Sequence, residues 1–259
     1  MTKNLPKISI ITPTLNQAQF IDQTIKSVLS QNYPNLEYII VDGGSSDETV
    51  KILESFGKKI LWISEKDRGQ SEAINKGLKM ATGEVLGYLN SDDYLEKDAL
   101  RKIGEFFSKK GNAYWLTGKC YIVDENSREC RKLITSYKNF LLRFLRSREI
   151  FNIVQFISQP STFWRKEVLT KIGYFDETLH YDMDYDYWLR IWQKYRLYFL
   201  DDYLSSYRVH KAAKAVVSPE TQFKVEFEIV RRYTNSKIIL LFHKFHARLV
   251  LMIYRLFFY

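Results

Sequence analysis

The sequence predicts an α/β fold, namely a doubly wound, mainly parallel β-sheet with helices on both faces. Three observations support this prediction. Strand-type and helix-type patterns alternate from Lys7 to about Asp124. The strand segments are almost continuously apolar, as in strands that are buried on both faces of a parallel sheet. The segments between them carry apolar residues three and four positions apart, which is the spacing of an amphipathic helix.

Apolar runs mark the expected strands, and three-and-four repeats mark the expected helices. In the first helix, this repeat places Ile21, Ile25, Val28 and Leu29 on one side. The expected strands span residues 7–12, 37–42, 60–64, 84–89 and 113–118, and the expected helices span residues 20–29, 47–56, 70–80 and 97–107.

The second half of the chain is less regular. Residues 131–151 mix basic and apolar side chains. We expect a short strand at 159–164 and a short helix that ends at Gly173. A Tyr- and Trp-rich helix at 182–195 and a strand at 198–210 are expected to follow.

The composition limits the classes of function. Hydrophobic residues make up 46% of the chain, which supports a large core and excludes a disordered protein. The net charge of +9 could serve nucleic acid, an anionic membrane or a phosphorylated substrate. Cys120 and Cys130 lack metal-ligand spacing and are expected to be reduced thiols. The first residues form no apolar run typical of a signal peptide, so we expect a cytoplasmic protein.

The C-terminal segment, residues 237–259, is strongly apolar, but basic residues and histidines interrupt it. A membrane-spanning helix needs about 20 predominantly apolar residues with few charges. The pattern favours an amphipathic helix that lies on a membrane surface. The alternative is a terminal helix packed on the domain or in a homodimer. The aromatic chain end, Phe257–Tyr259, favours the membrane, because exposed aromatic residues are otherwise a liability.

Polar residues follow several of the expected strands, at the point where each strand ends. Because the carboxyl ends of parallel strands meet at one edge of a doubly wound sheet, we expect the ligand site there. Carboxylates, amides and glycines reach this edge together. The loops concerned are Thr12–Asn16, Asp42–Asp47, Glu65–Gly69 and Asn90–Asp93.

Asp92 and Asp93 are adjacent acids in the last of these loops. Two carboxylates held together repel unless a cation neutralises them. A divalent cation that bridges to a diphosphate would use their oxygens as hard ligands. A helix N-cap is the alternative, and it would be favoured for a tandem Asp considered alone. The other polar loops at the same edge favour the metal.

Asp42 and Arg68 are further candidate contacts. Asp42 ends an apolar strand before two glycines, and its carboxylate can accept a hydrogen bond from a base N–H or a ribose hydroxyl. Arg68 is placed to meet a phosphate, with a solvated loop charge as the alternative. Residues Ser45–Asp47 are expected to cap the following helix.

In order and spacing, these loops resemble the family 2 glycosyltransferases of the GT-A fold. The resemblance covers residues 7–215. It rests on Thr12–Asn16, Val41–Asp47, Glu65–Gln70, Asn90–Asp93, Phe175–Glu177, Asp184–Arg190 and Tyr207–His210. The resemblance implies a GT-A domain at 1–215, with a nucleotide-sugar-binding half at 1–124 and an acceptor half at 125–215. Residues 216–259 would form a helical, membrane-associating extension.

The resemblance also implies a role for each matching residue. Asp42 would read the nucleotide base. Asp92 and Asp93 would hold a divalent cation, Mn²⁺ or Mg²⁺, with Asp93 as the direct ligand. His210 would complete the metal or phosphate site. The residues implied to bind the nucleotide-sugar donor are Pro13, Thr14, Asn16, Asp42, Asp67, Arg68 and Asp92.

Asp184 is the implied general base, and helix geometry tests this role independently. Asp182, Asp184 and Asp186 are two residues apart, so a helix cannot aim all three at one substrate. Asp186 can pair with Arg190 at i+4, and Asp182 sits at the N-cap position. Asp184 therefore stays available, and an aromatic wall would raise its pKa into the range useful for a base. A first-turn acid that favours the helix dipole is the alternative. Met183 stands where the family often has Glu.

Gln159 and Trp164 belong to a polar and aromatic patch that precedes this helix. An aromatic face packs on the C–H groups of a sugar ring, and an amide bonds its hydroxyls. We expect both residues to bind the acceptor, although core packing explains Trp164 equally well.

The expected reaction is a single displacement that inverts the sugar configuration. The donor is expected to be a UDP-sugar by family habit. The acceptor is expected to be lipid-linked or a polysaccharide, at the inner face of the cell membrane, in bacterial surface-polysaccharide or lipopolysaccharide assembly. A nucleotidyltransferase also uses paired acids and a metal. A catalytically inactive membrane-surface scaffold and a nucleic-acid-binding protein are further alternatives. We expect no nucleic acid partner, because acidic rather than basic side chains gather at the ligand edge.

Overall fold

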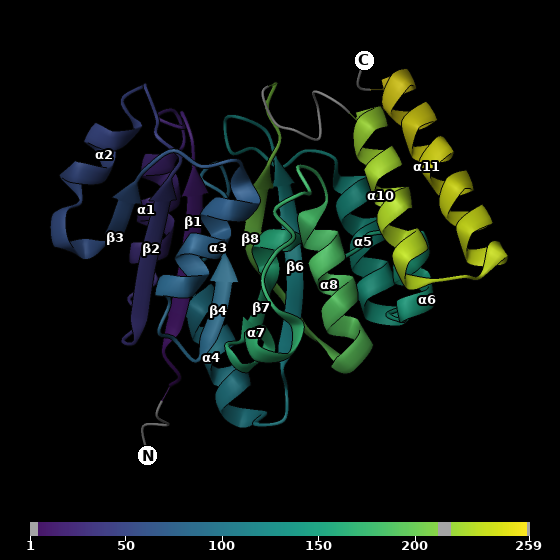
Figure 1. The fold of residues 1–259 in the computed structure, drawn as a ribbon, viewed down its shortest axis with the longest axis horizontal. Coiled ribbons are helices and arrows are strands. Elements are labelled where there is room, and N and C mark those ends of the chain that lie inside the picture. Colours follow the sequence, from purple (N-terminus) through teal and green to yellow (C-terminus); the bar gives the residue numbers. More distant parts are fainter. Residues whose placement is uncertain (1–4, 212–218, 258–259) are drawn as a thin grey trace.

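The computed structural model describes residues 5–211 and 219–257, and a mixed β-sheet forms its centre (Figure 1). The sheet has eight strands in the order β3-β2-β1-β4-β7-β6-β8-β5. The strands are β1 (Ile8–Thr14), β2 (Leu36–Asp42), β3 (Leu61–Ser64), β4 (Val85–Tyr88), β5 (Tyr94–Leu95), β6 (Trp115–Val123), β7 (Thr162–Arg165) and β8 (Leu197–Arg208).

Strands β1 to β4 run parallel to one another, so their carboxyl ends reach the same edge of the sheet, at the top of Figure 1. Strand β7 is antiparallel to both β4 and β6, whereas β6 and β8 are parallel. Strand β5 is antiparallel to β8. The predicted mainly parallel sheet is therefore confirmed. Strand β5 was not predicted, because Tyr94–Leu95 is too short to show a period in the sequence.

Helices cover both faces of the sheet, as predicted. The sheet divides the hydrophobic core in two, because successive strand residues point to opposite faces. The α-helices are α1 (Ile21–Leu29), α2 (Thr49–Ser55), α3 (Gln70–Met80), α4 (Ala99–Lys109), α5 (Lys132–Phe144), α6 (Arg148–Ile153), α7 (Glu167–Ile172), α8 (Met183–Lys194), α10 (Pro219–Tyr233) and α11 (Lys237–Phe257). Two short 3₁₀ helices are η1 (Gly57–Lys59) and η2 (Gln159–Ser161). Ile10 and Ile40 pack under α1 and α4, whereas Ile11 and Ile39 pack under α3 and α8.

An aromatic cluster fixes α8 on the sheet. Trp188 of α8 lies between Trp115 of β6 and Trp164 of β7, with ring centroids 6.0 and 5.4 Å away. All three indoles are fully buried. Such pairs contribute about 0.5–1.5 kcal/mol each beyond the burial of their area. The cluster therefore holds the first turn of α8, which carries Asp184, in a fixed place.

Helices α10 and α11 extend the core on the α8 side (Figure 1). Ile229 and Val230 of α10 are fully buried in the cluster that also contains Trp188. His243 of α11 is buried, and its Nδ1 lies 2.9 Å from the carbonyl oxygen of Asn152 in α6. The predicted C-terminal helices are thus confirmed. The expected domain boundary at residue 215 and the aromatic residues Phe258 and Tyr259 lie outside the described residues.

Among the helices of residues 5–211 and 219–257, none is long and apolar enough to cross a bilayer.

Candidate active site

The loops after β1 and β2 are bonded to each other at the carboxyl edge of the sheet. Thr14 pairs in register with Asp42, and Pro13 with Val41. Asn16 has a φ of 51°, a conformation that Asn tolerates better than most residues. Its Oδ1 accepts a hydrogen bond from the backbone N–H of Ser46 at 2.8 Å. The predicted donor residues of these two strands therefore lie together, with Pro13 and Thr14 buried and Asn16 exposed.

Asp42 is fully buried, and its carboxylate is bonded within its own loop. It accepts hydrogen bonds from the backbone N–H groups of Gly44 at 3.1 Å and Ser45 at 3.0 Å. The hydroxyl of Ser64 donates to it at 2.6 Å, and the hydroxyl of Ser45 donates as well. Three of these bonds end on Oδ2 and one on Oδ1, so Oδ1 keeps one acceptor position. Because Asp42 is fully buried, the loop around it must move before this oxygen can meet a ligand.

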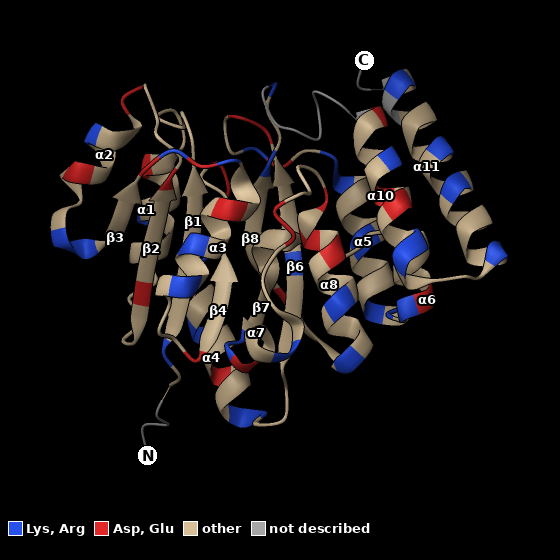
Figure 2. Ribbon diagram, viewed as in Figure 1, with Lys and Arg blue, Asp and Glu red and all other residues tan. Residues whose placement is uncertain are grey.

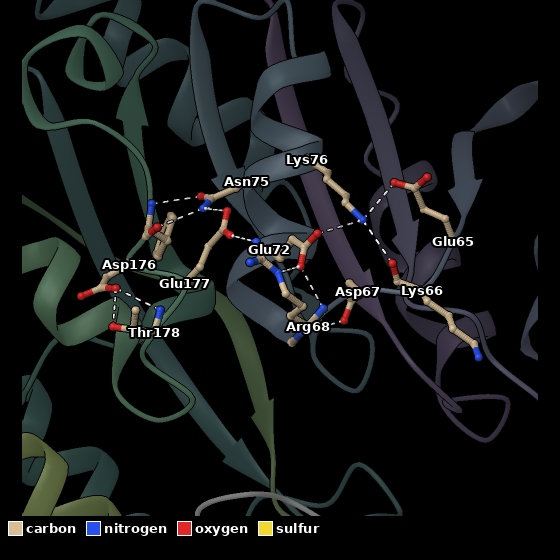
Figure 3. A network of polar contacts seen from close by, with 12 residues as sticks. Glu65, Lys66, Asp67, Arg68, Glu72, Asn75, Lys76, Asp176, Glu177 and Thr178 are labelled. Carbon is tan, nitrogen blue, oxygen red and sulfur yellow. Dashed lines mark hydrogen bonds and ion pairs between the residues drawn. The ribbon is translucent and has the colours of Figure 1, made fainter.

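Asp67 and Arg68 lie beside these loops and belong to a surface network (Figure 3). Asp67 Oδ1 accepts a hydrogen bond from the backbone N–H of Gly69 at 2.9 Å. Its Oδ2 would be only 2.6 Å from a Cβ atom at position 43, so the glycine there leaves room for this carboxylate. Burial raises the pKa of Asp67.

The side chain of Arg68 is 77% exposed, and two carboxylates hold it. Its Nε lies 2.8 Å from Glu72 in α3, and its Nη2 lies 2.6 Å from Glu177. Glu177 also accepts a hydrogen bond from Asn75 at 3.0 Å (Figure 3). Arg68 is thus an exposed cation in ion pairs. It must exchange at least one carboxylate for a phosphate to serve a donor.

Asp92, Asp93 and His210 come together where the loop after β4 meets the end of β8. Asp92 Oδ2 lies 3.0 Å from His210 Nε2. Asp93 is fully buried and accepts a hydrogen bond from the backbone N–H of Arg208 at 2.8 Å. Burial, together with the negative charge of Asp92, raises the pKa of Asp93 well above its usual value. The three residues that the resemblance linked to a metal are therefore neighbours.

The guanidinium of Arg208 fixes this corner, and sequence reasoning missed it. The Arg208 side chain is almost fully buried. It donates hydrogen bonds to the backbone oxygens of Asp92 at 2.8 Å and Glu125 at 3.0 Å, and to Gln23 at 2.6 Å. Phe20 packs against Arg208 and against the ring of His210. In the sequence, Arg208 is marked by the Tyr207–His210 motif alone, and that motif does not distinguish a buried arginine from a solvated one.

The carboxylate and imidazole groups at this corner are of the kinds that bind a divalent cation, but they are not arranged around a common point. Carboxylates and an imidazole suit Mn²⁺, and carboxylates alone suit Mg²⁺. A cation would also relieve the repulsion that raises the pKa of Asp93. In the part of the chain that the structure describes, however, no three His, Cys, Asp or Glu side chains are arranged to hold a metal.

Asp184 lies in the first turn of α8 and is partly exposed. The amide of Gln155 donates a hydrogen bond to it at 3.4 Å. Burial raises the pKa of Asp184, and the backbone N–H of Tyr185, followed by Lys138 of α5, opposes that rise. The predicted ion pair between Asp186 and Arg190 is confirmed, at 2.9 Å.

Asp182 does not cap α8 with its side chain, as an N-cap residue was expected to do. It occupies the N-cap position of α8 with a φ of 52°, but its side chain makes no capping hydrogen bond. Instead its Oδ1 accepts a hydrogen bond from Gln222 of α10 at 2.9 Å. The expectation considered α8 alone, whereas the packing of α10 decides the orientation of Asp182.

Gln159 and Trp164 take different places. Gln159 lies beneath the carboxyl edge, where its amide donates to the backbone oxygen of Tyr88 at 2.6 Å. Its Oε1 is buried without a hydrogen-bond partner among the described residues. Trp164 is fully enclosed by Trp188 and Phe175. None of its surface is open to an acceptor, so core packing accounts for Trp164.

The family model for glycosyl transferase family 2 matches residues 9–173, which is more than half of the chain. The chain belongs to glycosyl transferase family 2. The match contains all the predicted donor residues and the Asp92–Asp93 pair. Asp184 and His210 lie beyond it, so their roles rest on the geometry and on the motifs around them.

Several curated glycosyltransferases resemble this chain in sequence. An uncharacterized glycosyltransferase of Rickettsia prowazekii is 31% identical over 80% of this chain and 65% of its own length. The putative teichuronic acid biosynthesis glycosyltransferase TuaG of Bacillus subtilis is 38% identical over 46% of this chain and 48% of its own length. The chain therefore spans less than two thirds of the length of these curated relatives.

Solved structures show the same fold. The crystal structure of S. aureus TarS 1–349 in complex with UDP-GlcNAc has a TM-score of 0.68 and 26% identity, and the match covers 89% of this chain and 67% of that one. The mannosyltransferase PcManGT of Pyrobaculum calidifontis, in complex with GDP-Man and Mn²⁺, has a TM-score of 0.70 and 18% identity, over 98% of this chain and 76% of that one. The family 2 chain described here therefore has the GT-A fold.

Proposed function

We propose that this chain is an inverting glycosyltransferase that moves a sugar from a UDP-linked donor to a hydroxyl of a lipid-linked or polysaccharide acceptor. The observation that carries the proposal is the placement of Asp184. It is a partly exposed carboxylate whose pKa is raised by burial, on a helix held rigidly by the aromatic cluster. A general base works best when its pKa lies near the working pH. The complex of TarS with UDP-GlcNAc supports the nucleotide assignment.

The donor would lie across the loops at the carboxyl ends of β1 to β4. Pro13, Thr14 and Asn16 would line the nucleoside pocket, and Asp42 would accept a hydrogen bond from the base at Oδ1, to which Ser45 donates. Asp67 would contact the nucleoside, and Arg68 would release Glu177 to meet the diphosphate. An exposed arginine loses little when it exchanges one anion for another.

Asp92, Asp93 and His210 would hold the divalent cation, Mn²⁺ or Mg²⁺. When bound, this ion supplies positive charge to the diphosphate as that group departs. Asp184 takes the proton from the acceptor hydroxyl while the hydroxyl oxygen bonds to the anomeric carbon. The bond from that carbon to the diphosphate oxygen breaks at the same time. Attack from the opposite face inverts the configuration. Gln159 would assist at the acceptor side.

The test is binding of a panel of nucleotide-sugars by calorimetry, with and without Mn²⁺, on the wild type and Asp93→Ala. We expect one UDP-sugar to bind in a Mn²⁺-dependent manner and Asp93→Ala to lose that binding. Glu105→Ala, a half-exposed acid within α4 and outside the site, is the control. Absence of binding by every donor would contradict the proposal. Release of pyrophosphate from a sugar phosphate and UTP would point to a nucleotidyltransferase, and a salt-sensitive DNA shift to nucleic-acid binding.

We further propose that the protein works at the inner face of the cell membrane, through an apolar face formed by α5 and α11. The outward side chains of α11 follow helical spacing, and α11 carries basic residues without a single acid (Figure 2). Tyr137 of α5 contacts His246 of α11, which joins the two helices. The exposed apolar residues of this face are Leu133, Tyr137, Phe140 and Phe144 in α5, and Ile238, Leu241, Phe242, Phe245, Leu249, Met252, Ile253 and Leu256 in α11.

An apolar stripe flanked by cations is complementary to anionic lipid headgroups above acyl chains. We expect the protein to sediment with phosphatidylglycerol vesicles. The double change Leu241→Ser with Phe245→Ser should weaken this binding more than tenfold, because each buried side chain contributes roughly 1.5–3 kcal/mol. Leu61→Ser, an exposed position on β3, is the control. If the wild type does not bind vesicles but forms a homodimer in light scattering, the apolar face is a contact with a second copy of the chain.

A further inference from the structure

A row of polar and aromatic side chains joins α5 to β8. Asn139 and Arg143 are four residues apart in α5 and therefore lie on one face of that helix. Asn139 Nδ2 donates a hydrogen bond to the hydroxyl of Tyr203 at 3.1 Å, and Arg143 Nη1 lies 3.6 Å from Asp201. Asp201 and Tyr203 alternate along β8, so both can face α5. The α5–β8 seam consists of Lys119, Tyr121, Asn139, Arg143, Arg146 and Tyr203, with Asp201 between them.

Strand β6 contributes an aromatic ring and a cation to the seam. The rings of Tyr121 and Tyr203 stack face to face, with centroids 3.7 Å apart and planes 2° from parallel. Lys119 Nζ lies 4.7 Å from the centre of the Tyr203 ring. The register of β6 and β8 shifts beside Lys119, and such an irregularity can redirect side chains. Both tyrosines are only partly buried, so they present ring surface and hydroxyl groups to solvent.

The seam carries more cations than acids. Lys119 and Arg143 share the carboxylate of Asp201, at 3.0 and 3.6 Å. Arg146 follows α5, and its guanidinium lies 5.6 Å from the centre of the Phe199 ring. Within the described ranges, no carboxylate forms an ion pair with Arg146. Three cations with one acid make the seam a place that attracts an anion.

The chemistry of the seam fits a saccharide chain that carries negative charge. Aromatic rings pack on the C–H groups of sugar rings, and the amide of Asn139 and the tyrosine hydroxyls can bond sugar hydroxyls. The planar fork of an arginine binds a carboxylate or a phosphate through two parallel hydrogen bonds. A neutral sugar uses only the first of these features, and a simple anion uses only the second.

The seam leads toward the proposed site. Strand β8 continues from Tyr203 to Arg208, whose backbone N–H donates a hydrogen bond to Asp93. Tyr203 and Arg208 are five residues apart, which is about 17 Å along an extended strand. A single sugar cannot span this distance, whereas a chain of sugars can.

We propose that the α5–β8 seam binds the saccharide chain of an anionic acceptor, with Arg143 and Arg146 on its carboxylate or phosphate groups and Tyr121 and Tyr203 against its sugar rings. The inference rests on the proposed function, and it narrows the acceptor to a chain that carries negative charge. Arg143 also lies over the exposed ring of Phe144 in the apolar face of α5. The seam therefore borders that face, and a chain on a lipid anchor can reach it as well as a free one.

The test is calorimetric binding of hexagalacturonide, a carboxylate-bearing saccharide, with maltohexaose as the neutral chain of equal length. We expect the wild type to prefer hexagalacturonide. The double change Arg143→Met with Arg146→Met should weaken its binding at least about tenfold, because hydrogen bonds to charged groups contribute that much. Arg101→Met, at an exposed position of α4, should keep the wild-type affinity and is the matched control.

A change of opposite sign guards against a loss of binding through misfolding. Asp201→Asn leaves Lys119 and Arg143 without their shared acid, so hexagalacturonide should bind more tightly, by up to about fivefold. Tyr121→Leu should weaken the binding of both saccharides, because it removes ring surface that does not depend on charge.

Equal affinity of the wild type and the double arginine variant for hexagalacturonide overturns the proposal, as does a wild type that binds neither saccharide. Phosphatidylglycerol vesicles distinguish the source of the anion. If the double variant loses vesicle binding but retains hexagalacturonide binding, the arginines bind lipid headgroups and the proposal is wrong. The titration needs no donor and no turnover. Hexagalacturonide binding by a protein that consumes no UDP-sugar would support the seam and contradict the transferase reaction alone.

Discussion

The donor side and the acceptor side of the site are built in different ways. On the donor side, the loops after β1 and β2 bond mainly to themselves or to each other, as Asp42 does with Gly44 and Ser45. On the acceptor side, the surroundings of Asp184 come from helices that are distant in sequence, such as α5, which carries Lys138. Local motifs therefore determine these two donor loops, whereas tertiary packing determines the environment of the base.

The largest expected difference between the two sides is in stability. We expect Trp164→Ala to lower the free energy of unfolding by about 3–5 kcal/mol, because it removes a fully buried indole from the cluster that holds α8. Urea unfolding measures the change. Leu15→Ala, at an exposed position in the donor loop after β1, should change stability by less than about 0.5 kcal/mol. A small loss in Trp164→Ala would show that α8 is held by other contacts.

The pH dependence of stability should have opposite signs in the two halves of the chain. In the N-terminal half, at the edge of the sheet opposite the donor loops, burial alone would raise the pKa of Glu37, but hydrogen bonds from Lys7, Ser9 and Thr82 lower it to about 2. A carboxyl with a lowered pKa stabilises the fold above its ordinary value of 4.5, and this contribution is lost as the pH falls toward 2. Glu37→Gln should therefore reduce the loss of stability on acidification.

On the acceptor side, the pKa of Asp182 is about 8 against an ordinary 3.8, so its folded form binds a proton that the unfolded form releases. Stability is then lost as the pH rises from about 4 to about 8. Asp182→Asn should be more stable than the wild type at pH 8, with a smaller difference at pH 5. Urea unfolding at both pH values checks this. Equal differences at pH 5 and pH 8 would contradict the raised pKa.

The smallest expected effect concerns Arg68. Glu177→Gln removes one of its two carboxylate partners, so the arginine should reach a diphosphate more easily. We expect UDP to bind more tightly by no more than about fivefold, because exposed ion pairs contribute little. Glu65→Gln is the matched control, because it breaks an ion pair with Lys76 and keeps both ion pairs of Arg68. Weaker UDP binding by Glu177→Gln would indicate that Glu177 itself contacts the nucleotide.

The same contrast explains how far the sequence could predict the structure. Strands β1 to β4 and their loops were predicted because apolar runs and glycines are local signals. Arg208 was missed because nothing in its neighbourhood distinguishes a buried arginine from a solvated one. Trp164 was assigned to the acceptor because composition cannot separate an aromatic platform from a core residue. Lys138 was missed because Asp184, the acid whose pKa it lowers, lies on another helix.

The most direct test of the central claim is turnover of the UDP-sugar that the protein binds, compared between the wild type and Asp184→Asn. We predict that Asp184→Asn binds the donor with unchanged affinity but transfers the sugar about 10²–10⁴-fold more slowly, because a general base contributes a factor of that size. Transfer by Asp184→Asn at the wild-type rate would contradict the account.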